Sequence, residues 1–170
     1  MADIDRILRR MIVRSFPRLR RLPITIRWGL ESEDLLLYSL ERGTHLIRVN
    51  DELRPAPGIV LEGGLVHELC HIDADMAMGR FQRALAWERY ARSLWFRTFE
   101  ERATELRAID LGYGPHLLAF VRFARRLGYQ FTREHGLLYA EIARLITSSA
   151  EGARRRTEYS PAFPRRRCAP

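Results

Sequence analysis

Two histidines and a glutamate occupy one short segment of the chain, His67-Glu68-Leu69-Cys70-His71. On a helix, His67 and His71 would lie on one face, one turn apart. Two neutral imidazoles can bind Zn²⁺ at ~2.0–2.1 Å and leave room for a third ligand and a water. Zinc lowers the pKa of bound water toward ~7, and Glu68 would accept its proton as general base. The spacing therefore predicts the core of a zinc-dependent hydrolase.

The surrounding residues favour a real site over a chance match. Gly63 and Gly64 lie about one turn before the first histidine. Glycine destabilises a helix relative to alanine, so these glycines predict that another element approaches closely. Cys70 would point about a quarter-turn away from the face of the two histidines. We therefore interpret Cys70 as a small buried residue and not as a ligand.

A third ligand must come from elsewhere in the chain, and a predicted helix at residues 98–111 offers carboxylates. Glu101 and Glu105 are four residues apart and share a face with Ala108 and Gly112, whose small size suits helix packing. Glu101 would bind zinc, and Glu105 would accept a hydrogen bond from a histidine ligand and fix its tautomer. The alternative for this helix is an exposed charged face.

The segment Glu101-Arg102-Ala103-Thr104-Glu105, downstream of the histidine motif, gives the chain a family resemblance. Over residues 24–127 the sequence resembles the gluzincin zinc peptidases, and among them the small single-domain minigluzincins. The resemblance implies an α+β fold. A small three-stranded sheet would pack on an active-site helix, and the helical C-terminal part would carry the third ligand.

The same resemblance implies roles for individual residues. His67, His71 and Glu101 would hold one zinc ion per chain, and Glu68 would be the catalytic base. Glu105 would stand where the family usually has aspartate. The long segment between His71 and Glu101 implies an inserted helix. The substrate would run antiparallel to an exposed edge strand, which we expect at residues 44–49.

The remaining elements are predicted from hydrophobic periodicity and from helix-capping and turn residues. Asp3 can cap a first helix that carries Ile4, Leu8 and Met11. The other expected elements are strands at 24–28, 35–40 and 44–49, and helices at 59–78, 82–96, 98–111, 115–127 and 132–148.

The predicted helix at 82–96 is rich in aromatic residues. Their spacing favours a face buried in the core, and any exposed part would line a substrate cleft. The residues of this face are Trp87, Tyr90, Leu94, Trp95 and Phe96.

We expect residues 1–150 to form a single zincin-like metallopeptidase domain. Residues 151–170 are rich in arginine and proline and predict a flexible tail. Minigluzincins resemble zymogens in which a C-terminal segment lies in the cleft, so residues 158–163 could leave the enzyme latent.

Charge and composition restrict the partners. The chain has 29 basic residues, all arginine, and a net charge of +8. Such a charge suits nucleic acid, although an arginine-favouring GC-rich genome explains it equally simply. No apolar run is long enough for a membrane span, and the N-terminus lacks the apolar core of a signal peptide. We expect a cytoplasmic protein without a membrane partner, and with two cysteines no disulfide framework.

The leading hypothesis is a zinc metalloendopeptidase acting on peptide or unstructured protein substrates. Peptide hydrolysis also needs a group that stabilises the oxyanion besides the metal. Tyr113 and His116, directly after the glutamate helix, are the first candidates, and Tyr139 and His135 are further candidates by residue type.

Two alternatives remain open. The chain could be a DNA-associated protease similar to SprT-like proteins, in which a third histidine binds zinc. His116 would then replace Glu101 as a ligand. It could also be a non-catalytic regulatory module that keeps zinc for structure, which requires a fourth protein ligand.

Overall fold

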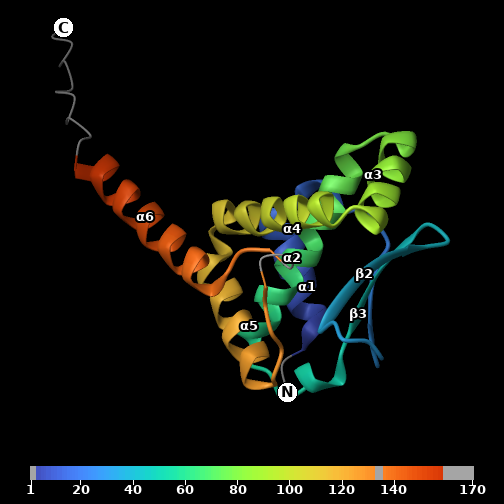
Figure 1. Cartoon of the computed structure of the whole chain (residues 1–170), viewed down its shortest axis with the longest axis horizontal. Helices are drawn as coiled ribbons and strands as arrows, with labels where there is room; N and C mark the ends of the chain where they lie inside the picture. The colour runs from blue at the N-terminus through green and yellow to red at the C-terminus, as the bar shows by residue number, and fades with distance from the viewer. Residues whose placement is uncertain (1–2, 133–135, 159–170) are drawn as a thin grey trace, which may run out of the picture.

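The computed structural model describes residues 3–132 and 136–158 as an α+β fold with a small mixed sheet (Figure 1). Short 3₁₀ turns follow α1 and β3, and a π-helical turn joins α4 to α5. The main elements are α1 (Ile4–Ser15), β1 (Ile24–Trp28), β2 (Leu36–Glu41), β3 (Thr44–Val49), α2 (Gly58–Ala77), α3 (Arg80–Arg92), α4 (Leu94–Ala108), α5 (Gly114–Arg126) and α6 (Tyr139–Glu158).

The sheet has the order β1-β3-β2, with β1 parallel and β2 antiparallel to β3. Arg42 and Gly43 both have positive φ and form the tight turn that pairs β2 with β3. β1 then lies on the other side of β3. The prediction that residues 44–49 form an edge strand is therefore wrong, because β3 is central and β2 is an edge.

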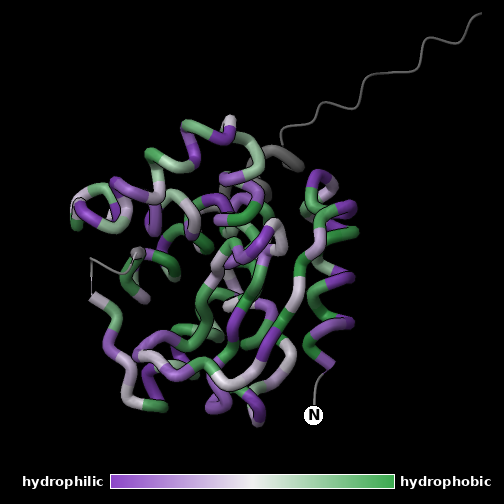
Figure 2. The backbone as a smooth tube through the Cα atoms, turned by 90° about the vertical axis from the view of Figure 1, so that its right-hand side faces the viewer, coloured by the Kyte–Doolittle hydropathy of each residue, from purple (hydrophilic) through white to green (hydrophobic). Residues whose placement is uncertain are grey.

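Helix α1 forms as its capping residue predicts. The Asp3 side chain accepts a hydrogen bond from the backbone N–H of Arg6 at 3.1 Å. Ile4, Leu8 and Met11 are buried on one face of the helix. Figure 2 shows hydrophilic and hydrophobic residues alternating along this helix, as expected for an amphipathic element.

Helix α2 runs through the core and is buried on several faces. Gly63 explains how α5 can pack against it, because a Cβ there would lie 2.2 Å from the carbonyl oxygen of His116. A Cβ on Gly64 would lie 2.5 Å from Leu36 Cδ1 in β2. The predicted close approach is confirmed, and its partners are another helix and the sheet.

Helix α3 departs most from expectation. None of its side chains is buried, and Figure 1 shows it projecting from the body of the molecule. Ser93 ends α3 and caps α4, accepting a hydrogen bond from the Phe96 N–H. This break divides the predicted 82–96 helix, so its aromatic residues do not share one core face. Trp87 is 41% exposed and Trp95 75% exposed.

Helix α6 also differs from its predicted bounds, starting at Tyr139 and continuing to Glu158 instead of ending near residue 148. Residues 159–170, which make up most of the expected tail, lie outside the described residues. Within the described part of the chain, no helix has both the length and the apolar character needed to cross a membrane.

Candidate metal centre

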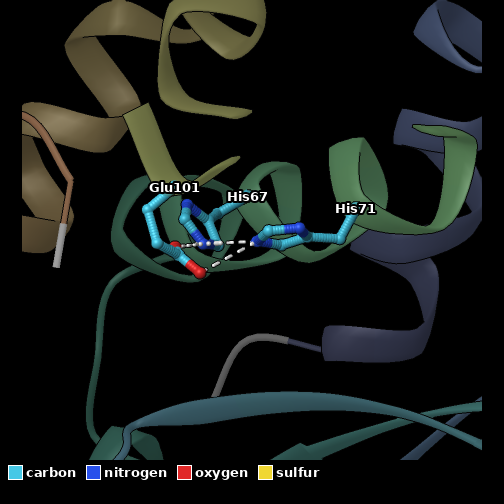
Figure 3. A group of neighbouring side chains, drawn as sticks. All are labelled: His67, His71 and Glu101. Atoms are coloured by element: carbon cyan, nitrogen blue, oxygen red, sulfur yellow. Dashed lines mark hydrogen bonds and ion pairs between the residues drawn. The ribbon is translucent and has the colours of Figure 1, made fainter. Parts of the chain in front are cut away.

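The two histidines of the motif lie on α2, and Glu101 reaches them from α4 (Figure 3). His67 and His71 are one turn apart with their Nε2 atoms 3.1 Å from each other. Glu101 Oε2 lies 2.9 Å from His67 Nε2, and Glu101 Oε1 lies 3.6 Å from His71 Nε2. Two helices therefore bring together three donor atoms that are distant in the sequence.

Glu101 is buried because it belongs to a row of buried residues along one side of α4. This row consists of Glu101, Thr104, Glu105 and Ala108, spaced three or four residues apart. The predicted inward face of this helix is thus confirmed as far as Ala108. The prediction is wrong for Gly112, which is exposed, lies in the π-helical turn after α4 and has positive φ.

The donor set fits a metal ion. Ligand bonds of ~2.0–2.2 Å in a tetrahedral zinc site place neighbouring donor atoms ~3.3–3.5 Å apart. The two Nε2 atoms lie 3.1 Å apart, and two different oxygens of Glu101 lie 2.9 and 3.6 Å from them, so small movements would bring three donor atoms to that spacing. These residues form the only group of at least three metal-binding side chains that converges in the described part of the chain. They could hold a metal ion and leave a coordination position open.

Without a metal, the same atoms hold a proton. Burial lowers the pKa of His67, but the adjacent Glu101 carboxylate outweighs burial and raises it to about 10. Burial likewise raises the pKa of Glu101, but hydrogen bonds from His67 and His71 bring it well below its usual range. A metal would replace the shared proton, so metal affinity should fall as pH falls.

Glu68 is buried beside this group and is 7% exposed. Burial raises the pKa of its carboxyl group, while His67 and His71 are close enough for their charges to oppose that rise. The backbone of Tyr38, in edge strand β2, also opposes the rise in the pKa of Glu68, so this strand lies near the glutamate.

Sequence reasoning missed two residues of the site. The Tyr90 hydroxyl donates a hydrogen bond to Glu101 Oε1, and the partial burial of this tyrosine, followed by the Glu101 charge, raises its pKa. The Thr104 hydroxyl lies 3.4 Å from His71 Nδ1. Thr104 shares a helix face with Glu101 and was detectable by spacing. Tyr90 was not, because its position depends on how α3 folds back at Ser93.

Glu105 is buried, and its carboxylate accepts a hydrogen bond from the backbone N–H of Leu137. Gly136 packs so closely that a Cβ there would lie 2.4 Å from Glu105 Oε2. Burial raises the pKa of Glu105 to about 7, against the opposing effect of His67. The expected hydrogen bond from a histidine ligand to the Glu105 carboxylate remains a prediction.

The candidates for oxyanion stabilisation have other partners. Tyr113 Oη lies 3.0 Å from Ser15 Oγ, and His116 Nε2 lies 3.2 Å from Glu62 Oε2. The Tyr139 hydroxyl accepts a hydrogen bond from Arg122 Nε at 2.6 Å. His135 lies outside the described residues.

Cys70 is 1% exposed and belongs to the hydrophobic core. Burial raises the pKa of its thiol to about 12, which disfavours the thiolate that binds metals. Its interpretation as a packing residue is confirmed.

Fold and site together define an α+β protein with a candidate metal centre of two histidines and a glutamate. Comparisons with protein-family models, curated proteins and solved structures match nothing to this chain. Inferences about its activity therefore rest on the residues of the site.

Proposed function

We propose that the protein is a zinc metallopeptidase that hydrolyses peptide bonds with a metal-bound water and Glu68 as general base. The observation that carries this proposal is the convergence of His67, His71 and Glu101 beside a buried Glu68. Two imidazoles, one carboxylate and an open position are the ligand pattern of catalytic zinc.

The chain's own residues supply the rest of the chemistry. Zinc, when bound, would acidify the attacking water and polarise the substrate carbonyl. Glu68 would accept the proton of the water as it attacks and deliver it to the leaving amine. Its buried position would keep competing water from the proton it carries.

A peptide substrate is favoured by the edge strand next to the site. β2 pairs with β3 along one side only, and the backbone of Tyr38 lies near enough to Glu68 to lower its pKa. An extended peptide can add to such an edge through main-chain hydrogen bonds. We propose that the substrate lies along β2, with its scissile bond near Glu68.

The alternatives receive less support from the geometry. His116, the ligand that an SprT-like site would need, pairs with Glu62, whereas Glu101 lies against both histidines. A closed structural zinc site would need a fourth protein ligand. Cys70, the nearest thiol in the sequence, lies in the hydrophobic core instead.

The test is zinc stoichiometry combined with cleavage of a reduced, carboxymethylated protein, which is permanently unfolded. The full chain should bind one zinc ion and cleave this substrate, and a chelator should stop cleavage. Glu68→Gln should bind zinc as tightly as the wild type but lose at least ~10²-fold in turnover, because general-base catalysis contributes about that much. Undiminished turnover by Glu68→Gln would refute the assigned role. Absence of cleavage by the zinc-loaded chain would refute the proposed function.

A further inference from the structure

Two side chains of α3, Trp87 and Tyr90, are three residues apart and extend from this helix toward α2 and α4. Each of these side chains donates a hydrogen bond to a carboxylate. Trp87 Nε1 donates to both oxygens of Asp75, at 3.0 and 3.2 Å, and the Tyr90 hydroxyl donates to Glu101. Because no side chain of α3 is buried, these two hydrogen bonds and the edge-on contact of the Trp87 ring with Tyr38 attach the helix to the rest of the protein here.

The contact of Tyr90 distinguishes the two oxygens of Glu101. Oε1 accepts the tyrosine hydroxyl and lies 3.6 Å from His71 Nε2, while Oε2 lies closer to a histidine, 2.9 Å from His67 Nε2. A carboxylate with both oxygens free can bind a metal through either one or through both. The hydrogen bond from Tyr90 occupies one lone pair of Oε1, which favours Oε2 as the oxygen that would bind the metal.

We propose that Tyr90 is a positioning residue that holds Glu101 as a one-oxygen ligand, and that Trp87 keeps Tyr90 in place. The proposal rests on the metal centre proposed above and extends it to a helix that contributes no ligand. By occupying Oε1, Tyr90 keeps the open coordination position available for water or substrate. Hydrogen bonds of this kind orient ligands and commonly change metal affinity ~10–100-fold.

Asp75, which accepts the hydrogen bonds of Trp87, is itself held by a further contact. It is 6% exposed and also accepts a hydrogen bond from the Tyr38 hydroxyl at 3.0 Å. Tyr38 in turn hydrogen-bonds to the buried His45 Nδ1 at 2.9 Å. The attachment point of α3 is therefore fixed to α2, β2 and β3.

The test is Tyr90→Phe in the full chain, which removes one hydroxyl from a helix without buried side chains. Zinc affinity is measured by competition with a coloured chelator, and the visible absorption of bound Co²⁺ reports coordination number. We expect a roughly 10-fold or greater loss of zinc affinity. The Co²⁺ absorption should weaken as Glu101 becomes a two-oxygen ligand.

Tyr129→Phe is the matched control, because the Tyr129 hydroxyl also donates to a carboxylate, Glu52, at 2.9 Å. It should leave both the affinity and the Co²⁺ spectrum unchanged. Trp87→Phe keeps an aromatic ring but removes the bond to Asp75, so its effect should have the same direction as Tyr90→Phe and be smaller.

An unchanged affinity and an unchanged Co²⁺ spectrum in Tyr90→Phe would overturn the proposal. A wild-type chain that binds neither Zn²⁺ nor Co²⁺ would overturn it as well. If the wild type binds zinc without cleaving peptides, the proposed function fails, and the effect of Tyr90→Phe on affinity still decides the positioning role.

Discussion

Glu105 is a buried acid, and its pKa of about 7 makes it a source of pH-dependent stability. In the folded chain it keeps its proton between about pH 4.5 and 7, whereas the unfolded chain has released it. Stability therefore falls as pH rises through that window and stays at its lower level above it. Glu105→Gln should raise the free energy of unfolding by about 2–3 kcal/mol at pH 8, with little gain at pH 4.5.

The measurement is urea unfolding of both chains, with a chelator present, at several values between pH 4.5 and 8. The informative quantity is the difference between variant and wild type, since other groups titrate in both. Glu88→Gln is the control for the loss of one carboxylate, because Glu88 lies on the exposed surface of α3, where it pairs with Arg92. A difference for Glu105→Gln that does not grow with pH would contradict the prediction.

At the scale of single residues, helical spacing predicted much of the metal centre. His67, His71 and Glu101 converge as predicted, because the first two share a helix face and the third belongs to a regular buried stripe. Spacing along one helix cannot predict a contact made between helices. The contact of Tyr90 with Glu101 depends on the turn at Ser93, which the aromatic pattern concealed.

At the scale of the elements, the packing of α2 requires glycine at position 63, and this requirement can be tested. Gly63→Ala places a methyl group against the backbone of His116, which cannot move without displacing α5. We expect it to destabilise the fold by about 2–4 kcal/mol in urea unfolding. At Gly64 the nearest atom is the end of the Leu36 side chain, which can rotate, so alanine there should cost about 1 kcal/mol.

Gly58→Ala in the same helix is the control. A Cβ at Gly58 would meet Ile7 Cδ1 at an ordinary 3.8 Å. Alanine should therefore be neutral or slightly stabilising there, because it favours the helix. Equal costs at Gly63 and Gly64 would show that the backbone contact is not the determining one.

The strands were more predictable individually than as a sheet. β1 and β3 begin and end where their β-branched residues and turns predict. Their order in the sheet depends on which side of β3 is free after the Arg42–Gly43 turn has paired β2 with the other side. The prediction of an edge strand at residues 44–49 was wrong because it considered each strand alone.

On the scale of the whole molecule, latency remains a prediction, since residues 159–163 lie outside the described part of the chain. Because α6 continues to Glu158, removing residues 159–170 deletes the segment without shortening the helix. If the segment blocks the cleft, cleavage of the unfolded substrate should rise at least several-fold at unchanged zinc content. A truncated chain as slow as the full chain would contradict autoinhibition.

The two helices that share the metal centre are joined by a segment without a buried side chain of its own, α3. A metal bridging His71 and Glu101 would close a loop of about 30 residues, much as a covalent cross-link does. Because the metal would bind the folded chain, its binding free energy would add to stability in a segment where hydrophobic burial contributes little. Loss of the metal should therefore lower the stability of the α3–α4 hairpin first, while the sheet and α2 keep their hydrophobic core.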